Sequence, residues 1–339
     1  MGASYFFGSL KPLIPYIAST GAYVPAKIVT NHDLATTLDT SDEWIYSHTG
    51  IKTRRIAAAH EASSDLGLIA AKQALSRARL APEDVDLIIV ATSTPDFTSF
   101  PSTASIIQEK LGAVRSGAMD LSAACTGFVY ALETARAFVS AGTAQNVIVI
   151  GTEVFSRILD WNDRNSAILF GDGAGAVVIT SAAPNSPSSI LGSVLRSEGS
   201  GADSLLRPVG GSRTPYVINS PLEATHLQMD GRRVYNFAVR AIKEVLEEAS
   251  SKFHFDLNEV KWFVPHQANS RIIEATAKRM GIPIERFFMN IAKFANTSAA
   301  SIPIALEELE HSGGVARGDL IVFVGFGAGL AYGASVLRW

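Results

Sequence analysis

The sequence of 339 residues contains a single cysteine, Cys125. A lone cysteine excludes an internal disulfide framework and is typical of a protein kept in a reducing compartment such as the cytosol. Charged residues are also scarce, at 18%, and the net charge of −3 gives no support for a nucleic-acid-binding protein. No apolar run reaches the roughly 18 residues that a membrane-spanning helix needs. The composition therefore predicts a cytoplasmic protein that binds neither nucleic acid nor membrane.

Sequence signatures of targeting and of bound metals or nucleotides are missing as well. The first residues lack the basic segment of a signal peptide, and Phe6 breaks the myristoylation pattern, so residues 1–14 are interpreted as an extension packed on the surface. The sequence has no HExxH, no paired CxxC and no Asp-rich calcium loop, so no metal site is expected. DGAG at 172–175 is not a P-loop, and no GxGxxG opens a βαβ unit convincingly, which disfavours nucleotide hydrolysis and hydride transfer.

What the sequence does have is apolar residues, at 47%, in runs typical of buried strands and amphipathic helices. This pattern predicts an α/β protein with a large core. Strands are expected at 15–24, 84–94, 145–154 and within 167–180. Helices are expected after an Asn31 cap, after a cap at Ser41 or Asp42, at 63–79, at 101–111 and following Cys125.

Three segments of the first half recur in the second half in the same order. EDV before DLIIVATST matches NEV before KWFVPHQAN, NVIVIGTEV matches DLIVFVGFG, and FGDGAGAVVI matches FGAGLAYGASV. Chance similarity of glycine-rich turns is the alternative to a duplication. The Ser-, Pro- and Gly-rich stretch that starts at 181 is interpreted as a linker and loop. The expected domains are therefore an α/β half at 15–180 that carries the cysteine and a second α/β half at 181–339.

Cys125 lies where the small, polar stretch SGAMDLSAAC turns into the apolar pattern of a helix. The first turn of a helix presents unpaired N–H groups and partial positive charge, which favour a thiolate. Such cysteines have pKa values of about 3.5 to 7.5, compared with about 8.5 for a free thiol. Cys125 is therefore a candidate nucleophile, and the alternative is a buried structural cysteine.

Two further residues are placed to assist a nucleophile. His266 follows the apolar segment WFVP and precedes a helix, a position where α/β sheets bind ligands. Asn296 lies in FANTSAAS, a loop entering a helix, from which it can donate a hydrogen bond to developing charge. Helix capping is the alternative for both residues. Backbone amides of VGFGAGLAYG (324–333) can complete an oxyanion hole.

At this point the chain resembles a known family, the β-ketoacyl-acyl-carrier-protein synthases III. The matching motifs are TSDEWI (40–45), SAACTGF (122–128), FGDGAGA (170–176), VPHQAN (264–269) and ANTSAAS (295–301). The resemblance implies a thiolase fold, in which duplicated α/β halves form five alternating layers, and a homodimer. It also implies a catalytic trio of Cys125, His266 and Asn296.

The reaction implied by the resemblance is a decarboxylative Claisen condensation that starts type II fatty-acid synthesis. Cys125 would take an acyl group from acyl-CoA, and malonyl-acyl-carrier protein would then yield β-ketoacyl-carrier protein. His266 and Asn296 would stabilise the enolate. Backbone amides of Cys125 and of the segment at 325–329, with Gly327 and Ala328, would bind the tetrahedral oxyanion. Acyl-CoA is a substrate here, and no permanently bound cofactor is expected.

The resemblance also assigns residues to CoA and to the carrier protein. Trp44 and Arg164 would flank the adenine, and Asn269 would bind the pantetheine arm. Arg271, together with Lys278 and Arg279, would attract an acidic carrier, unless these three form only a solvated helix face. Two positions depart from the family pattern. His48 replaces an arginine beside TSDEW, which puts part of the CoA-phosphate contact in doubt, and Ala328 replaces a glycine but keeps its backbone amide.

Three other readings compete with this assignment. A secondary-metabolism relative would use the same trio to acylate an alcohol or to condense unusual units. Papain-like proteases also use Cys, His and Asn in this order, but their CGSCW-type segment and disulfides are absent. A non-catalytic acyl-binding relative would be expected to lack a member of the trio, and all three are present.

Overall fold

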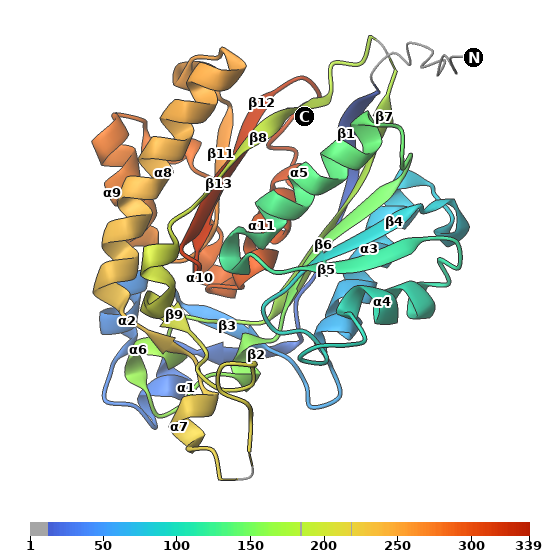
Figure 1. Ribbon diagram of the computed structural model, residues 1–339. Coiled ribbons are helices and arrows are strands. Elements are labelled where there is room, and N and C mark those ends of the chain that lie inside the picture. Colours follow the sequence, from blue (N-terminus) through green and yellow to red (C-terminus); the bar gives the residue numbers. More distant parts are fainter. Residues whose placement is uncertain (1–12, 184, 218) are drawn as a thin grey trace, which may run out of the picture.

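The computed structural model describes residues 13–183, 185–217 and 219–339, which form two main sheets with helices around and between them (Figure 1). The strands are β1 (Ile14–Tyr23), β2 (Lys27–Thr30), β3 (Thr53–Ile56), β4 (Leu87–Ala91), β5 (Gly117–Leu121), β6 (Val147–Glu153), β7 (Gly173–Ala182), β8 (Ser189–Ser197), β9 (Leu205–Leu206), β10 (Gln228–Met229), β11 (Trp262–Pro265), β12 (Leu320–Gly327) and β13 (Ala331–Arg338). The helices are α1 (Asn31–Ala35), α2 (Asp42–Thr49), α3 (Ser63–Ala78), α4 (Thr103–Leu111), α5 (Gly127–Ser140), α6 (Arg164–Ala167), α7 (Leu222–Thr225), α8 (Gly231–Phe253), α9 (Ser270–Met280), α10 (Ile291–Phe294) and α11 (Ser301–His311).

The first sheet has five strands in the order β1-β7-β6-β4-β5. Strand β4 pairs in parallel with both β5 and β6, whereas β7 pairs antiparallel with β6 and β1. Every residue of β4 and β6 is buried, because helices cover both faces of the sheet. This burial explains the continuous apolar runs in these two segments.

The second sheet has four strands in the order β11-β12-β13-β8, which repeats the order of the first sheet. Strand β8 takes the position of β1, antiparallel to its neighbour. The fifth strand is reduced to a parallel bridge between Phe263 and Phe287. The expected duplication is therefore confirmed. The expected linker from 181 is wrong for most of its length, because β7 runs to Ala182 and Ser189–Ser197 forms β8.

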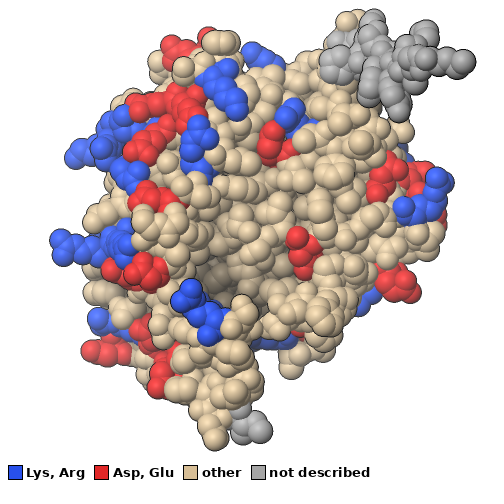
Figure 2. All heavy atoms as spheres, in the orientation of Figure 1, with Lys and Arg blue, Asp and Glu red and all other residues tan. Residues whose placement is uncertain are grey.

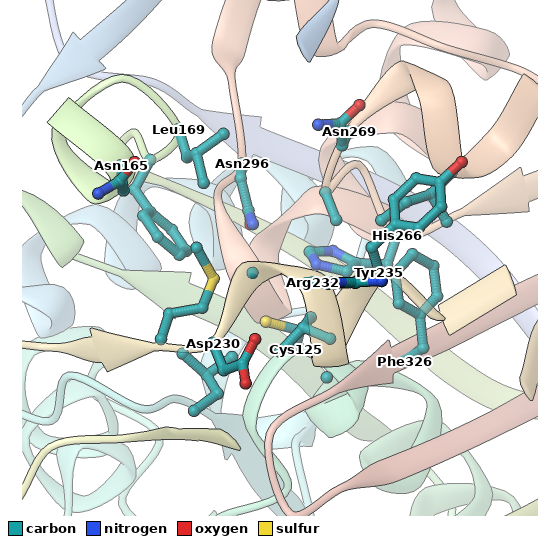
Figure 3. A pocket seen from close by; sticks show the side chains of 18 of the residues that line it. Cys125, Asn165, Leu169, Asp230, Arg232, Tyr235, His266, Asn269, Asn296 and Phe326 are labelled. Carbon is teal, nitrogen blue, oxygen red and sulfur yellow. The ribbon is translucent and has the colours of Figure 1, made fainter. Parts of the chain in front are cut away.

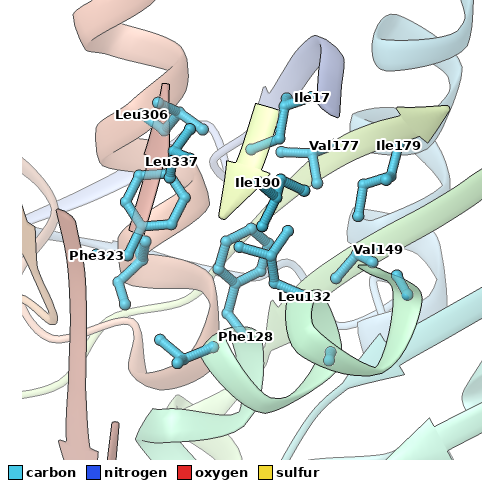
Figure 4. Packing of buried hydrophobic residues seen from close by; sticks show 14 of the residues in the cluster. Ile17, Phe128, Leu132, Val149, Val177, Ile179, Ile190, Leu306, Phe323 and Leu337 are labelled. Carbon is cyan, nitrogen blue, oxygen red and sulfur yellow. The ribbon is translucent and has the colours of Figure 1, made fainter. Parts of the chain in front are cut away.

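Helices α5 and α11 lie between the two sheets and form the middle layer (Figure 1). Helices α3 and α4 cover the outer face of the first sheet, and α8 covers the outer face of the second, with α9 packed beside it. In the middle layer Phe128 and Leu132 of α5 pack against Phe323 of β12 and Val149 of β6 (Figure 4). These layers confirm the thiolase fold that the resemblance implied.

Most of the expected helix limits agree with the structure, and one cap does not. Thr30, not Asn31, caps α1, because its hydroxyl accepts from the Asp33 amide while the Asp33 carboxylate accepts from the Thr30 amide. Asn31 instead donates to Asp42 and to the carbonyl of Ile51. Ser41 caps α2 as expected. The expected surface extension falls almost wholly on residues 1–12, which lie outside the described residues. Among the described helices, none combines the length and the apolar character needed to cross a membrane.

Candidate active site

Cys125 lies in a 3-10 turn (Ala124–Thr126) between β5 and α5, at the centre of the molecule. The preceding residue, Ala124, has a φ of 46°, a left-handed conformation that is costly for a residue with a side chain. The cysteine is only 5% exposed. A side chain at Gly327 would place its Cβ 2.7 Å from the Cys125 Cβ and 3.2 Å from Sγ, so this position requires glycine. The end of β12 therefore packs directly on Cys125.

The expected low pKa of Cys125 is wrong. Burial raises the pKa of the thiol to about 12, and the nearby Glu153 carboxylate acts in the same direction, while a hydrogen bond with Ser298 partly opposes them. Desolvation disfavours the thiolate more than the helix start favours it. The sulfur is therefore a thiol at neutral pH, and acting as a nucleophile would require a base to take its proton.

His266 directly follows β11, and its amide donates to the carbonyl of Val324. The residue is 1% exposed, and burial lowers its pKa to about 3, so the imidazole is neutral. The Ser301 hydroxyl lies 2.7 Å from Nδ1 and accepts from the Gln267 amide. This arrangement lets Ser301 donate to Nδ1, which places the ring proton on Nε2. The ring also packs edge-on against Phe326 at 5.1 Å.

Asn296 connects the two halves of the molecule. Its backbone amide donates to the carbonyl of Leu169, and its carbonyl accepts from the Gly171 amide. Its Oδ1 accepts from the Ser298 amide at 2.9 Å, so Nδ2 remains as the donor end of the side chain. Asn269, and not His266, caps the helix α9. The capping alternative thus fails for His266, whereas Asn296 does bond the loop that leads into α11.

Cys125, His266 and Asn296 all line one cavity of about 540 Å³ (Figure 3). The cavity runs between the α6 region of the first half and the start of α8 in the second. Of the residues expected to contact substrates, Asn269 and Gly327 line it as well. The remaining lining residues, which the sequence did not single out, include Asn165, Met229, Asp230, Arg232, Tyr235 and Phe326.

Trp44, Arg164 and Arg271 lie outside this cavity lining, near α2. The guanidinium of Arg164 sits 4.7 Å from the centre of the Trp44 ring, and the His48 ring stacks on the same indole at 4.2 Å. A planar group can enter between Trp44 and Arg164 only if the two move apart. Asn269 donates to the carbonyl of His48, and Arg271 donates to that of Ser47, so α9 is tied to α2.

Arg271, Lys278 and Arg279 are all exposed on α9. Figure 2 shows basic side chains interspersed with acidic ones over this side of the molecule. Ala328 follows β12 directly, next to Gly327.

Sequence reasoning missed three polar residues around the trio. Ser298 and Ser301 belong to the ANTSAAS segment, where only Asn296 was singled out. Glu153 ends the apolar strand β6, and a glutamate at the carboxyl end of a buried strand is the signal that identifies it. Its carboxyl group is wholly buried. In the ranges 13–183, 185–217 and 219–339, no cluster of three or more His, Cys, Asp or Glu side chains is arranged to hold a metal ion.

Comparison with known proteins identifies relatives over nearly the whole chain. The family model for 3-oxoacyl-[acyl-carrier-protein] synthase III matches residues 119–199, and the model for its C-terminal part matches residues 251–339. The β-ketoacyl-[acyl-carrier-protein] synthase III of Clostridium acetobutylicum is 46% identical over 327 residues, covering 95% of this chain and 98% of that protein. The corresponding protein of Caldanaerobacter subterraneus is 47% identical over 324 residues, 95% of this chain and 97% of that one.

Solved structures agree with these sequence matches. The 3-oxoacyl-[acyl-carrier-protein] synthase III of Aquifex aeolicus has a TM-score of 0.88 at 46% identity, covering 96% of this chain and 100% of that one. The priming β-ketosynthase of the R1128 polyketide pathway has a TM-score of 0.90 at 35% identity, covering 96% and 97%. Two family models match segments of the chain, and relatives of about 46% identity with the same layered fold cover nearly all of it. The chain therefore belongs to the β-ketoacyl-acyl-carrier-protein synthase III family.

Proposed function

We propose that this protein catalyses the acyl-CoA-primed decarboxylative Claisen condensation with malonyl-acyl-carrier protein and so initiates type II fatty-acid synthesis. The observation that carries this proposal is the convergence of Cys125, His266 and Asn296 on one cavity from both halves of the chain. A sulfur nucleophile beside two neutral hydrogen-bond donors suits a reaction in which first a thioester and then an enolate must be stabilised.

In the first half-reaction Cys125 attacks the thioester carbon of acyl-CoA. The tetrahedral oxyanion forms beside the backbone amides of Cys125 and of the Gly327–Ala328 segment, which packs against the sulfur. The C–S bond to CoA then breaks, and CoA leaves as the thiolate. The acyl group remains on Cys125 as a thioester.

In the second half-reaction malonyl-acyl-carrier protein occupies the same channel. His266 and Asn296 donate hydrogen bonds to its thioester oxygen, and these bonds strengthen as loss of CO2 builds enolate charge. A neutral His266 suits this role. Its pKa of about 3 means that the ring is uncharged at neutral pH, and the one N–H that it keeps can donate a hydrogen bond to the enolate oxygen. The carbanion attacks the acyl group on Cys125, and the β-ketoacyl product leaves on the carrier.

The substrates are held along the path from the surface to the cavity. Trp44 and Arg164 bind the adenine of CoA after separating from each other, and Asn269 contacts the pantetheine arm where it enters. Arg271, Lys278 and Arg279 attract the acidic carrier protein, because all three are exposed near this entrance. The reaction needs no permanently bound cofactor, since the thioesters themselves supply the activated carbon.

We further propose that the protein is a cytoplasmic homodimer. Strand β5 forms the edge of the first sheet, and its unpaired backbone groups suit pairing with a second copy. Phe97 and Phe100, on the loop between β4 and α4, are 55% and 85% exposed, which is costly for phenylalanine unless a partner covers it. A lone cysteine suits the reducing cytoplasm.

A second candidate is a priming role in secondary metabolism with the same trio. The 35% identity to a priming β-ketosynthase of a polyketide pathway favours this alternative specifically. The two functions share the acylation step and differ in the acyl primer and in the fate of the product. The test must therefore identify the primer.

The first experiment is intact-protein mass spectrometry after mixing the protein with acetyl-CoA and a panel of longer acyl-CoAs. We expect an acyl adduct on the wild type and none on Cys125→Ala. Malonyl-acyl-carrier protein should then discharge the adduct to β-ketoacyl-carrier protein. The preferred adduct identifies the primer, and an adduct that malonyl-carrier protein cannot discharge would favour the acyltransferase alternative.

Asn296→Asp separates the two half-reactions. The aspartate keeps the shape of the side chain but replaces the Nδ2 donor with a charged acceptor that repels an enolate. We expect Cys125 to be acylated as in the wild type, while condensation falls by about a hundred- to a thousandfold. Equal losses in both steps would contradict the proposed role of Asn296.

A further inference from the structure

Glu153 is a wholly buried carboxylic acid that the reaction described above does not use. It is the last residue of β6, at the carboxyl end of the strand, where the two halves meet. It forms no ion pair among the described residues. A buried carboxylate without a cation is costly, so its surroundings must account for it.

Hydrogen-bond donors surround both oxygens of Glu153. On one side the Thr94 hydroxyl donates to Oε2 at 2.6 Å, and the Ser93 amide donates at 3.1 Å. On the other side the Ser298 hydroxyl donates to Oε1 at 3.0 Å. These bonds stabilise the ionised form against burial, and the balance leaves the pKa of the carboxyl raised to about 7.

Ser298 connects this carboxyl to the nucleophile. Its hydroxyl donates to Glu153 Oε1, and the turn that carries it (Ser298–Ala300) packs against the Ala124–Thr126 turn of Cys125, where Ser298 lowers the pKa of the thiol. The residue adopts a left-handed backbone with a φ of 48°, and its amide donates to Asn296 Oδ1. Strain at a non-glycine residue is maintained where the surrounding contacts over-determine it. Here the contacts hold the Ser298 hydroxyl on the Glu153 carboxyl group, beside the turn that carries Cys125.

We propose that Glu153 is the proton store for Cys125, and that Ser298 relays the proton between them. During acylation the Cys125 Sγ–H proton passes to Ser298 Oγ, while the Ser298 hydroxyl proton passes to Glu153 Oε1. The Sγ–C bond to the acyl group forms, the C–S bond to CoA breaks, and the CoA thiolate takes its proton from water. The acyl-enzyme thus carries a protonated Glu153.

Condensation runs the relay in reverse. The malonyl carboxylate leaves as CO2, the new C–C bond forms, and the C–Sγ bond breaks with its electron pair on sulfur. Glu153 returns its proton through Ser298 to Sγ, which restores the thiol and the carboxylate. One proton from water is consumed per turnover, on CoA, and no other reactant is needed.

His266 is less suited to take this proton. Its Nδ1 is occupied by the Ser301 hydroxyl, and its burial opposes a positive charge. A histidine that stays neutral through acylation also keeps the donor that the enolate needs afterwards. The relay therefore leaves His266 and Asn296 free for the second half-reaction.

The ionisable groups near Glu153 are few. Around it the segment Thr92–Thr94 after β4 and the turn Ser298–Ala300 before α11 offer only hydroxyls and amides. Asp172, before β7, is held by the amides of Ala57 and Ser156. Among the described residues Cys125 and His266 also lie in this region, and neither is charged at neutral pH. A pH dependence near 7 in the acylation step is thus assigned to Glu153.

The test is the pH profile of single-turnover acylation by acetyl-CoA, followed by quenching and intact mass. In the wild type we expect the rate to rise with pH and level off above about pH 7, as Glu153 ionises. Glu153→Gln keeps the shape of the side chain but cannot take up a proton. We expect its acylation rate to be at least about a hundredfold lower than that of the wild type at pH 7, and to keep rising with pH up to pH 9. Asp172→Asn is the matched control, a buried carboxyl without a link to Cys125, and should keep the wild-type profile.

Ser298→Ala keeps the carboxyl and interrupts the relay, so it should reproduce the profile of Glu153→Gln, and it decides the question if that variant does not fold. A loss by the same factor at every pH, with the plateau kept near pH 7, would show a merely structural role and overturn the proposal. So would wild-type rates in both variants.

The inference rests on Cys125 as the nucleophile of the proposed function, and alkylation separates the two. Iodoacetamide modifies Cys125 without any acyl-CoA, so its pH profile reports proton removal alone. Slower alkylation in Glu153→Gln and Ser298→Ala at pH 7 supports the relay even if no acyl-CoA is accepted. If the wild type forms an acyl adduct while the alkylation rate is unchanged in both variants, the proposed function stands and the relay is rejected.

Discussion

At the scale of single residues, the site depends on how closely the two halves approach each other. Gly327 allows β12 to pack on Cys125, and the same contact removes water from the sulfur. Burial then sets the protonation states, since it makes both Cys125 and His266 neutral. Proton transfer from a neutral Cys125 is therefore the step that the proposed relay must supply.

Gly327→Ala tests this close approach. The added methyl would lie 2.7 Å from the Cys125 Cβ, so the sulfur or the strand must move. We expect a loss of about 1 to 3 kcal/mol in stability and a large drop in the acylation rate of Cys125. Gly199→Ala is the control, because a Cβ there meets no atom within 4 Å. Thermal unfolding and adduct formation measure the two effects, and normal acylation in Gly327→Ala would contradict the prediction.

The sequence singled out Cys125, His266 and Asn296, because each lies at a recognisable change from one local pattern to another, and the structure brings all three to one cavity. It gave the wrong direction for the pKa of Cys125, because the helix start is local whereas burial comes from β12, about 200 residues further along. Glu153 was missed for a related reason. It ends a largely apolar strand segment, and the hydroxyls that donate hydrogen bonds to it come from Thr94 and Ser298, which are distant in sequence.

At the scale of elements, short helices present the residues that are proposed to bind substrate. Helix α2 begins at the Ser41 cap and carries Trp44, and it is tied to α9 by Asn269. Strand β8 was not predicted from the sequence, because serines and a glycine interrupt its apolar residues and the whole stretch after 181 has the composition of a loop. Helix and strand positions were otherwise readable, since most segments bury a regular face.

Ser41→Ala should separate helix capping from substrate binding. Removing the hydroxyl that accepts from the Trp44 amide costs about 1 kcal/mol and loosens the first turn of α2. We expect the KM for acyl-CoA to rise several-fold with little change in kcat. Ser102→Ala removes the matching cap of α4, which lies away from the cavity, and should cost similar stability without changing KM. An unchanged KM in Ser41→Ala would argue against CoA binding at Trp44.

At the scale of the whole molecule, two buried groups make opposite contributions to stability as pH changes. The pKa of His266 is lowered from 6.5 to about 3, so its contribution is present above pH 6.5 and is lost on acidification. The pKa of Glu153 is raised from 4.5 to about 7, so its contribution is present below pH 4.5 and is lost as pH rises towards 7. Between pH 8 and pH 5 each amounts to about 2 kcal/mol, and they nearly cancel.

Single variants should reveal each contribution by itself. From pH 8 to pH 5, we expect the free energy of unfolding of Glu153→Gln to fall by about 2 kcal/mol relative to the wild type. That of His266→Gln should rise by a similar amount. Urea denaturation at the two pH values measures both changes, and the other titrating groups cancel in the comparison. Parallel behaviour of the two variants would contradict the opposite signs.

The division into halves at 15–180 and 181–339 remains a proposal, but the hydrogen bonds of Asn296 to Leu169 and Gly171 cross between the two sheets. These bonds have a consequence for protein synthesis. A ribosome makes the cysteine about 170 residues before the asparagine, which at about 5 to 20 residues per second is a delay of roughly 10 to 30 s. Throughout that interval the nascent chain has its sulfur but lacks at least one of the two proposed donors, because His266 is made only about 30 residues before Asn296. The polypeptide therefore cannot begin condensing thioesters until its synthesis is almost finished.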